Sequence, residues 1–151
     1  MKIYNNISAY QAGNYAVVTV GTFDGLHQGH KKIIKRMKAI AKENDGETIL
    51  VTFDPHPRLI VNGYTSEIKF ITTQKRKISL LEKYGIDHLI VIPFTKEFSQ
   101  TSSADFIKNY LVDIIGVKKL IVGYDHHFGK GREGNYHMIE NMGKEFGFET
   151  D

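Results

Sequence analysis

The sequence predicts an α/β fold in which a doubly wound parallel sheet forms a single domain, residues 1–151. Two observations predict this fold. Short apolar runs rich in β-branched residues alternate with longer segments whose apolar residues recur at helical spacing. This strand–helix order repeats along the chain, and strands that are joined through helices pair in parallel. No linker, internal repeat or low-complexity tract divides the sequence.

The predicted strands are apolar runs that end in glycine, proline or aspartate. The first, AVVTVG, consists mostly of β-branched residues, which favour strands. The second is followed by Pro55-His56-Pro57, where proline prevents further ladder pairing. The strands are expected over residues 16–21, 47–54, 87–93 and 118–123.

Helices are predicted from apolar periodicity together with residues that start or stop a helix. Gly85 and Gly116 supply C-terminal stops, and serine or threonine residues can cap two of the N-termini. The helices are expected over 27–43, from Thr72 or Thr73 to Tyr84, from Ser102 or Ser103 to Gly116, and over 136–146. Residues 55–70 have no clear period and contain Asn62-Gly63, which favours a loop or flap.

Composition excludes several classes of protein. The chain has no cysteine, which excludes disulfides and thiolate metal sites. No apolar run is long enough to span a bilayer, and the N-terminal residues lack the features of a secretory signal. We therefore expect a cytoplasmic protein without a membrane partner.

Basic residues are unevenly distributed, although the net charge is only +3. Several crowd onto the first predicted helix: Lys31, Lys32, Lys35, Arg36, Lys38 and Lys42. Such a cluster is either a solvated helix face or a surface for a polyanion, whether nucleotide phosphate or nucleic acid.

Polar residues suited to chemistry follow the predicted strands. The sequences after them are GTFDGLHQGH, TFDPHP, PFTKEF and GYDHHFGKGREG. In an open parallel sheet, ligands bind beyond the carboxyl ends of the strands. These segments are therefore expected to meet at one edge of the sheet and to form the functional site there.

Two histidines, His27 and His30, lie three residues apart where the first helix begins. Both rings can lean to one side of the first turn. Free backbone N–H groups and the helix dipole favour an anion there and disfavour imidazolium. We therefore expect rings that are either neutral or paired with phosphate, each able to donate a hydrogen bond to a phosphate oxygen. Gly21 and Gly25 would allow a tight turn, and Gly29 would leave room for a ligand between the rings.

The segment GTFDGLHQGH resembles the His-x-Gly-His signature of the nucleotidyltransferase superfamily, and Gly25 after Phe-Asp is typical of the bacterial FAD synthetases. Three further stretches resemble that group: TFDPHP (52–57), residues 71–107, and VGYDHHFGKGREGN (122–135). The resemblance covers almost the whole chain. It implies the Rossmann-like sheet of the His-x-Gly-His nucleotidyltransferases.

This resemblance implies adenylyl transfer from Mg-ATP to FMN, which gives FAD and pyrophosphate. His27 and His30 would be catalytic. Implied nucleotide-binding residues are Gly21, Thr22, Phe23, Asp24, Gly25, His27, His30, Gly123, Lys130 and Arg132. Implied flavin-binding residues are Pro55, His56, Pro57 and Asp125. ATP and FMN are the expected small-molecule partners, Mg²⁺ accompanies ATP, and nucleic acid is not the expected ligand.

Several residues carry open alternatives. Asp24 either holds the turn or approaches the ribose, and GKGREG (129–134) is either a phosphate-reaching loop or a plain glycine-rich connection. His126 and His127 are either exposed to solvent or part of a metal site, but spacing alone identifies no ligand set. Phe23, Phe53, Phe94 and Phe98 belong to the core or flank a flavin or adenine ring.

The sequence departs from the family pattern at its C-terminal end. It stops at GFETD, before the Ser-Ser-Thr-x-x-Arg segment and the riboflavin-kinase domain of bacterial relatives. We therefore expect either an excised piece, which is the interpretation we favour, or a naturally shortened chain of doubtful activity. The alternatives are another nucleotidyltransferase, for example one that transfers a cytidylyl group to a phosphate, or a non-catalytic module that binds nucleotide or RNA.

Overall fold

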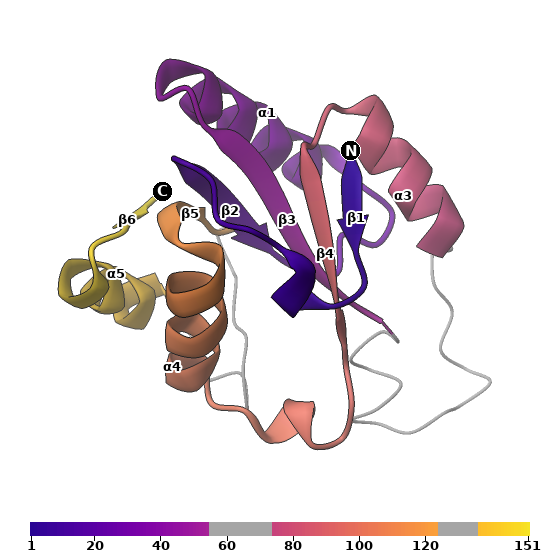
Figure 1. Cartoon of the computed structure of the whole chain (residues 1–151). Coiled ribbons are helices and arrows are strands. Elements are labelled where there is room, and N and C mark those ends of the chain that lie inside the picture. The colour runs from indigo at the N-terminus through magenta and orange to yellow at the C-terminus, as the bar shows by residue number, and fades with distance from the viewer. Residues whose placement is uncertain (55–73, 124–135) are drawn as a thin grey trace.

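The computed structural model describes residues 1–54, 74–123 and 136–151, and its described strands form one six-stranded sheet (Figure 1). The order across the sheet is β1-β4-β3-β2-β5-β6, and every neighbouring pair is parallel. The strands are β1 (Lys2–Tyr4), β2 (Ala16–Val20), β3 (Glu47–Asp54), β4 (His88–Pro93), β5 (Val117–Ile121) and β6 (Glu149–Thr150). The predicted parallel α/β sheet is confirmed.

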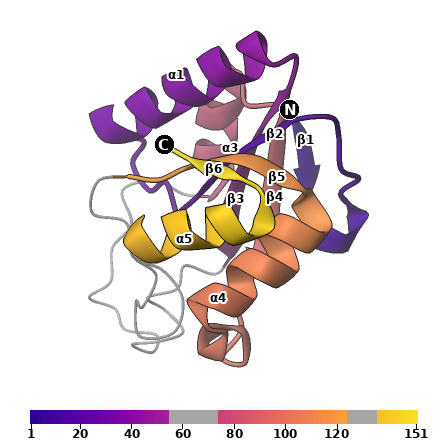
Figure 2. The same ribbon diagram turned by 90° about the vertical axis from the view of Figure 1, so that its left-hand side faces the viewer.

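Helices cover both faces of the sheet (Figures 1 and 2). Helices α1 and α3 lie on one face, and α4, its continuation η3 and α5 lie on the other. Their bounds are α1 Gln28–Glu43, α3 Gln74–Lys83, α4 Ser103–Phe106, η3 Ile107–Ile115 and α5 Tyr136–Phe146. Two single turns, η1 (Ile7–Ala9) and η2 (Phe98–Gln100), complete the described elements. Of the helices in these ranges, none combines the length and apolar character that crossing a bilayer requires.

Alternating strand residues build two separate cores. Val17 and Leu50 face α1 and α3, where they pack with Met37 and Leu81. Val18 and the other strand residues whose side chains point to the opposite face of the sheet pack against α4, η3 and α5. Because successive side chains of a strand point to opposite faces, strands buried on both faces are apolar throughout, as β2 is.

The helix boundaries follow the capping residues. Ser102 caps α4 by accepting a hydrogen bond from the Asp105 N–H, and Gly116 ends η3 with a left-handed φ of 72°. The helix after Ser102 differs from the expected one, because its residues from Ile107 to Ile115 are π-helical. Helix α1 begins at Gln28, one residue later than predicted, because His27 serves as its N-cap.

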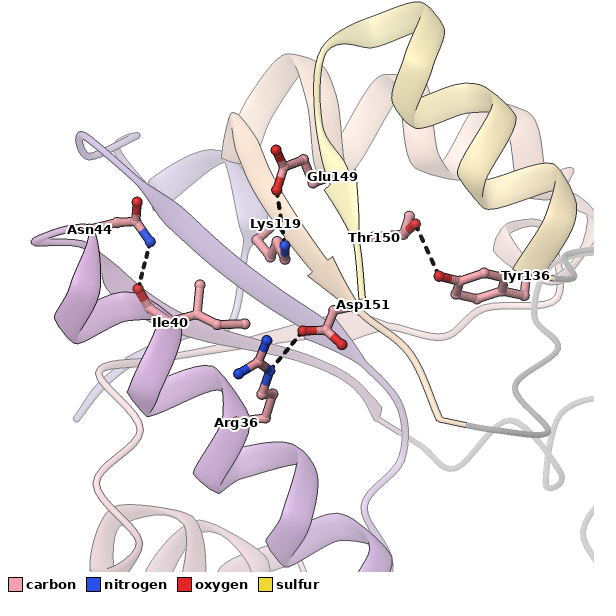
Figure 3. Close-up of polar contacts among 8 residues, drawn as sticks. All are labelled: Arg36, Ile40, Asn44, Lys119, Tyr136, Glu149, Thr150 and Asp151. Carbon is pink, nitrogen blue, oxygen red and sulfur yellow. Dashed lines mark hydrogen bonds and ion pairs between the residues drawn. The ribbon is translucent and has the colours of Figure 1, made fainter.

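The two outermost strands are short, and sequence periodicity did not predict β1. It has only three residues, which is too few for an alternating pattern to be visible. Strand β6 lies in the GFETD segment. Figure 3 shows how polar contacts hold that segment: Lys119 contacts Glu149 at 2.9 Å, and Arg36 of α1 contacts Asp151 at 2.8 Å.

The strand order creates a switch point between β2 and β5. After β2 the chain continues into α1 on one face, whereas β5 precedes α5 on the opposite face. Open α/β sheets bind ligands beyond the carboxyl ends of the strands at such a switch point. The loop that follows β2 leads to both histidines, because His27 is the N-cap of α1 and His30 lies in the first turn of that helix.

Gly143 of α5 allows close contact with the chain that leads into β6. A Cβ added there would lie 2.5 Å from the Phe148 carbonyl oxygen. We predict that Gly143→Ala lowers the free energy of unfolding by about 1–3 kcal/mol, because the overlap outweighs the better helix propensity of alanine, about 1 kcal/mol. Urea unfolding measures this, with Asn141→Ala at an exposed position of the same helix as the control. A Gly143→Ala protein as stable as the control would contradict the prediction.

Candidate functional site

The loop between β2 and α1, residues 21–27, has an unusual backbone. Phe23 and Leu26 have positive φ angles of 51° and 42°, and Gly25 lies between them at 81°. Residues other than glycine rarely adopt this left-handed backbone conformation, which costs on the order of 1–3 kcal/mol for each residue. Residues strained in this way cluster at functional sites. Of these three residues with positive φ, only Gly25 matches the expectation that glycine residues make the tight turn possible.

Burial of the two strained residues holds the loop in place. Phe23 is 3% exposed and Leu26 is 4% exposed, and both belong to the core between the sheet and α1. Burying a large apolar side chain contributes about 1.5–3 kcal/mol, which is enough to offset the backbone strain. The loop therefore has a fixed shape that its own side chains impose.

The fixed loop builds a stack of three rings. The Phe23 and His30 ring centroids are 4.4 Å apart at 27°, and those of His27 and His30 are 3.8 Å apart at 25°. His30 is the member that both other rings contact. The prediction that the two histidines lean together is confirmed. At a centroid separation of 3.8 Å, however, the two rings are in contact, and no ligand fits between them. The expectation that Gly29 leaves room for a ligand between the rings is therefore wrong.

His27 is held by the end of the helix that it caps. Its Nδ1 accepts a hydrogen bond from the Gly29 N–H at 3.1 Å. A Cβ at position 29 would lie 3.0 Å from the His27 ring, so this glycine makes room for the ring itself. Because Nδ1 is the acceptor, Nε2 carries the proton of the neutral ring and is the available donor.

His30 is uncharged at neutral pH. Burial, the larger cause, and the neighbouring His27 lower the pKa of His30 from 6.5 to about 4, while the Asp24 carboxylate acts in the opposite direction. Its Nδ1 is buried and has no hydrogen-bond partner among the described residues. The other ring nitrogen, Nε2, is therefore the atom suited to contact a ligand. The expectation of an uncharged ring is confirmed for His30.

Two glycines lie at the carboxyl ends of β2 and β5. Gly21 follows β2, and a Cβ there would lie 3.1 Å from the Phe23 ring, so its absence lets that ring close over the loop. Gly123 follows β5 and lies near Ile33 of α1. The structure thus brings the predicted residues from Gly21 to His30 and Gly123 to one edge of the sheet.

Lys77 also lies in this region, although it was not among the residues predicted for the site. Its ammonium donates to the Thr22 carbonyl oxygen at 2.8 Å and to Thr52 Oγ1 at 3.1 Å, and the residue is 7% exposed. Burial lowers the pKa of Lys77, and the carboxylates of Asp24 and Asp54 raise it. A signal was present in the sequence, because Lys77 lies four residues before Leu81 on the buried face of α3.

Aromatic residues also gather at the carboxyl ends of β3 and β4. Phe53 lies 5.4 Å from Phe94 and 5.9 Å from Phe98, measured between ring centroids. Phe98 in turn contacts Phe106 of α4 at 6.0 Å. These rings pack on one another, whereas Phe23 supports His30 on the other face of the sheet.

The remaining predicted site residues lie outside the described ranges: Pro55, His56, Pro57, Asp125, Lys130 and Arg132. The same holds for the loop or flap at 55–70, for His126 and His127, and for the GKGREG segment. Within residues 1–54, 74–123 and 136–151, no three His, Asp or Glu side chains converge in a way that could hold a metal ion.

The low pKa of His30 predicts a pH dependence of stability. Between about pH 6.5 and 4 the unfolded chain binds a proton at this histidine that the folded chain does not bind. The stabilisation is therefore complete above about pH 6.5 and decreases as the pH falls toward 4. His30→Gln should flatten this part of the pH profile of the free energy of unfolding, measured with urea, whereas His137→Gln at an exposed position should not. Parallel profiles for wild type and His30→Gln would contradict the prediction.

Comparison with known proteins identifies relatives over most of the chain. The family model described as FAD synthetase matches residues 10–151. A bifunctional riboflavin kinase/FMN adenylyltransferase from Buchnera aphidicola (Schizaphis graminum) is 35% identical over 89% of this chain and 43% of its own length. One from Listeria monocytogenes is 37% identical over 78% of this chain and 37% of its own length. The chain thus spans less than half the length of these two relatives.

A solved structure shares the fold. The crystal structure of a protein titled macrolide-efflux protein, from Streptococcus pneumoniae, superposes with a TM-score of 0.85 over 99% of this chain and 49% of its own, at 20% sequence identity. At that identity the likeness shows the fold alone. The family match, in contrast, includes β2 and the histidine loop and continues to the end of β6. The chain therefore belongs to the FAD synthetase family.

Proposed function

We propose that this chain transfers the adenylyl group of ATP to FMN and so forms FAD and pyrophosphate. The observation that carries the proposal is the stack of His27 and His30 at the N-terminus of α1, in a chain of the FAD synthetase family. Two relatives of this chain carry FMN adenylyltransferase in their names. The activity and its substrates are proposed for this chain, which covers 43% and 37% of those relatives.

The reaction needs alignment and charge stabilisation more than acid–base chemistry. A phosphate oxygen of FMN attacks the α-phosphorus of ATP, the bond from that phosphorus to the bridging oxygen breaks, and pyrophosphate leaves with the bonding electrons. The attacking oxygen is already anionic, so no general base is required. The protein must hold two polyanions in line and stabilise charge on the leaving group.

Neutral imidazoles suit that task. An uncharged His30 donates one N–H to a phosphate oxygen, and its low pKa keeps it in this form throughout the physiological range. Nε2 of His27 supplies a second donor beside it, since Nδ1 is engaged by the Gly29 N–H. The N-terminal N–H groups of α1 add a partial positive charge at the same place.

Mg²⁺ enters this scheme with ATP, as part of the substrate. A magnesium ion bound to the phosphates neutralises charge and orients the leaving group. Asp24 either holds the turn or approaches the ribose. We propose Gly21, Thr22, Phe23, Gly25 and Gly123 as further residues of the nucleotide side.

The remaining roles rest on sequence resemblance. Lys130 and Arg132 are proposed for the phosphates, and Pro55, His56, Pro57 and Asp125 for the flavin. A riboflavin-kinase domain, which is part of the names of the relatives, is proposed as the covalent partner of this domain in a longer protein. The proposed reaction takes place in the cytoplasm, on the sequence grounds given above.

Substitution of His30 tests the proposal. His30→Ala removes a proposed donor to the transition state, and loss of one such donor typically lowers kcat about 100-fold or more. FAD formation from ATP and FMN, followed by chromatography, measures the effect. Lys42→Ala, at the opposite end of α1 and exposed, should retain the wild-type rate. Unchanged turnover in a folded His30→Ala protein would overturn the proposed role.

The same assay distinguishes the nucleotide. Replacing ATP with CTP should abolish the product if the transferred group is adenylyl. A faster reaction with CTP would instead indicate a cytidylyltransferase.

A further inference from the structure

Lys77 is a buried cation that contacts strand β3 and the loop that follows β2. Lysine is rarely buried without partners, because removal of an ammonium from water is unfavourable. Here two oxygen acceptors contact the ammonium, the carbonyl of Thr22 and the hydroxyl of Thr52. The carboxylates of Asp24 and Asp54 further favour its charged form. The fold thus buries a positive charge at this position, together with oxygen acceptors and carboxylates that compensate for the lost hydration of the ammonium.

The contacts of Lys77 join three elements at one point. Lys77 comes from α3, Thr52 from β3, and Thr22 from the loop that follows β2. Thr22 directly precedes Phe23, which has a left-handed backbone and stacks on His30. A short chain of contacts therefore leads from the ammonium to the ring of His30, through one carbonyl and one strained residue.

We infer that Lys77 is a positioning residue, which holds the strained loop so that Phe23 and His30 stay stacked. The anchor at Thr22 fixes the carbonyl just before the left-handed turn, where a strained backbone requires external support. A hydrogen bond from a charged donor is stronger than one between neutral groups, so this contact can offset the strain of the backbone. The consequence for turnover rests on the proposed function, whereas the effect on the His30 environment does not.

A merely structural lysine would behave differently from a positioning one. If Lys77 only filled space in the core, Lys77→Met would lower stability but leave the stack intact in the folded protein. If it holds the loop, Lys77→Met should loosen Phe23 and expose His30 to water. Among the described residues, the groups that face His30 are Phe23, His27 and Asp24, and the substitution replaces none of these residues.

The titration of His30, followed by NMR in the ligand-free full chain, tests this inference. In Lys77→Met the His30 pKa should rise from about 4 toward 6.5 by about one unit or more, because the ring gains solvent. Lys83→Met, at an exposed position of the same helix, should leave it unchanged. An unaltered His30 titration in folded Lys77→Met would overturn the inference.

A second variant keeps the test decisive if Lys77→Met does not fold. Thr52→Val removes one acceptor of the ammonium, keeps the side-chain volume and leaves the charge in place. We expect a smaller upward shift of the His30 pKa, about half a unit. The absence of any shift in that variant would also overturn the inference.

Kinetics separate this inference from the proposed function. Lys77→Met should lower kcat for FAD formation about 10-fold or more with a smaller change in the KM for ATP, and Lys77→Arg, which keeps the charge and the donors, should recover most of the rate. If wild type forms no FAD, the proposed function fails while the titration still tests Lys77. If wild type is active and His30 titrates normally in Lys77→Met, only the inference fails.

Discussion

The strained turn between β2 and α1 is the constraint on which the candidate site depends. Phe23 and Leu26 accept a left-handed backbone because their side chains are buried in the core beneath α1. This conformation brings the ring of Phe23 against His30, and His30 against His27. A more relaxed turn would separate the rings, and the burial that keeps His30 uncharged would be lost.

The strand order of the sheet determines where this turn lies in the molecule. Strand β2 is central, its two neighbours β3 and β5 are parallel to it, and the helices that follow β2 and β5 lie on opposite faces. The carboxyl end of β2 is followed by the N-terminus of α1, with its partial positive charge, and by two imidazoles. An anionic ligand such as a nucleotide triphosphate matches that electrostatic environment, and a cationic ligand would not.

Sequence alone predicted the central part of this arrangement. The strands β2, β3, β4 and β5 were evident as short apolar runs rich in β-branched residues, and the helices α1 and α5 were evident from apolar residues at helical spacing. Three residues in β1 were too few to show a pattern. The pairing of His27 with His30 followed from helical spacing, but contact between their rings did not, because it depends on the backbone angles of Phe23 and Leu26. The contact of Lys77 with this loop was not predicted, for a similar reason. Its partner at Thr22 is a backbone carbonyl, which no residue type marks.

The proposed adenylyl transfer requires the histidine stack to contact the phosphates of ATP. The most direct test is NMR of the histidine side-chain nitrogens in the ¹⁵N-labelled wild-type chain, titrated with Mg-ATP and assigned with His27→Gln and His30→Gln variants. Nε2 of His27 and of His30 should shift together and saturate at one ATP concentration, while the nitrogens of His88 and His137 stay in place. Saturable ATP binding that leaves His27 and His30 unshifted would contradict the claim.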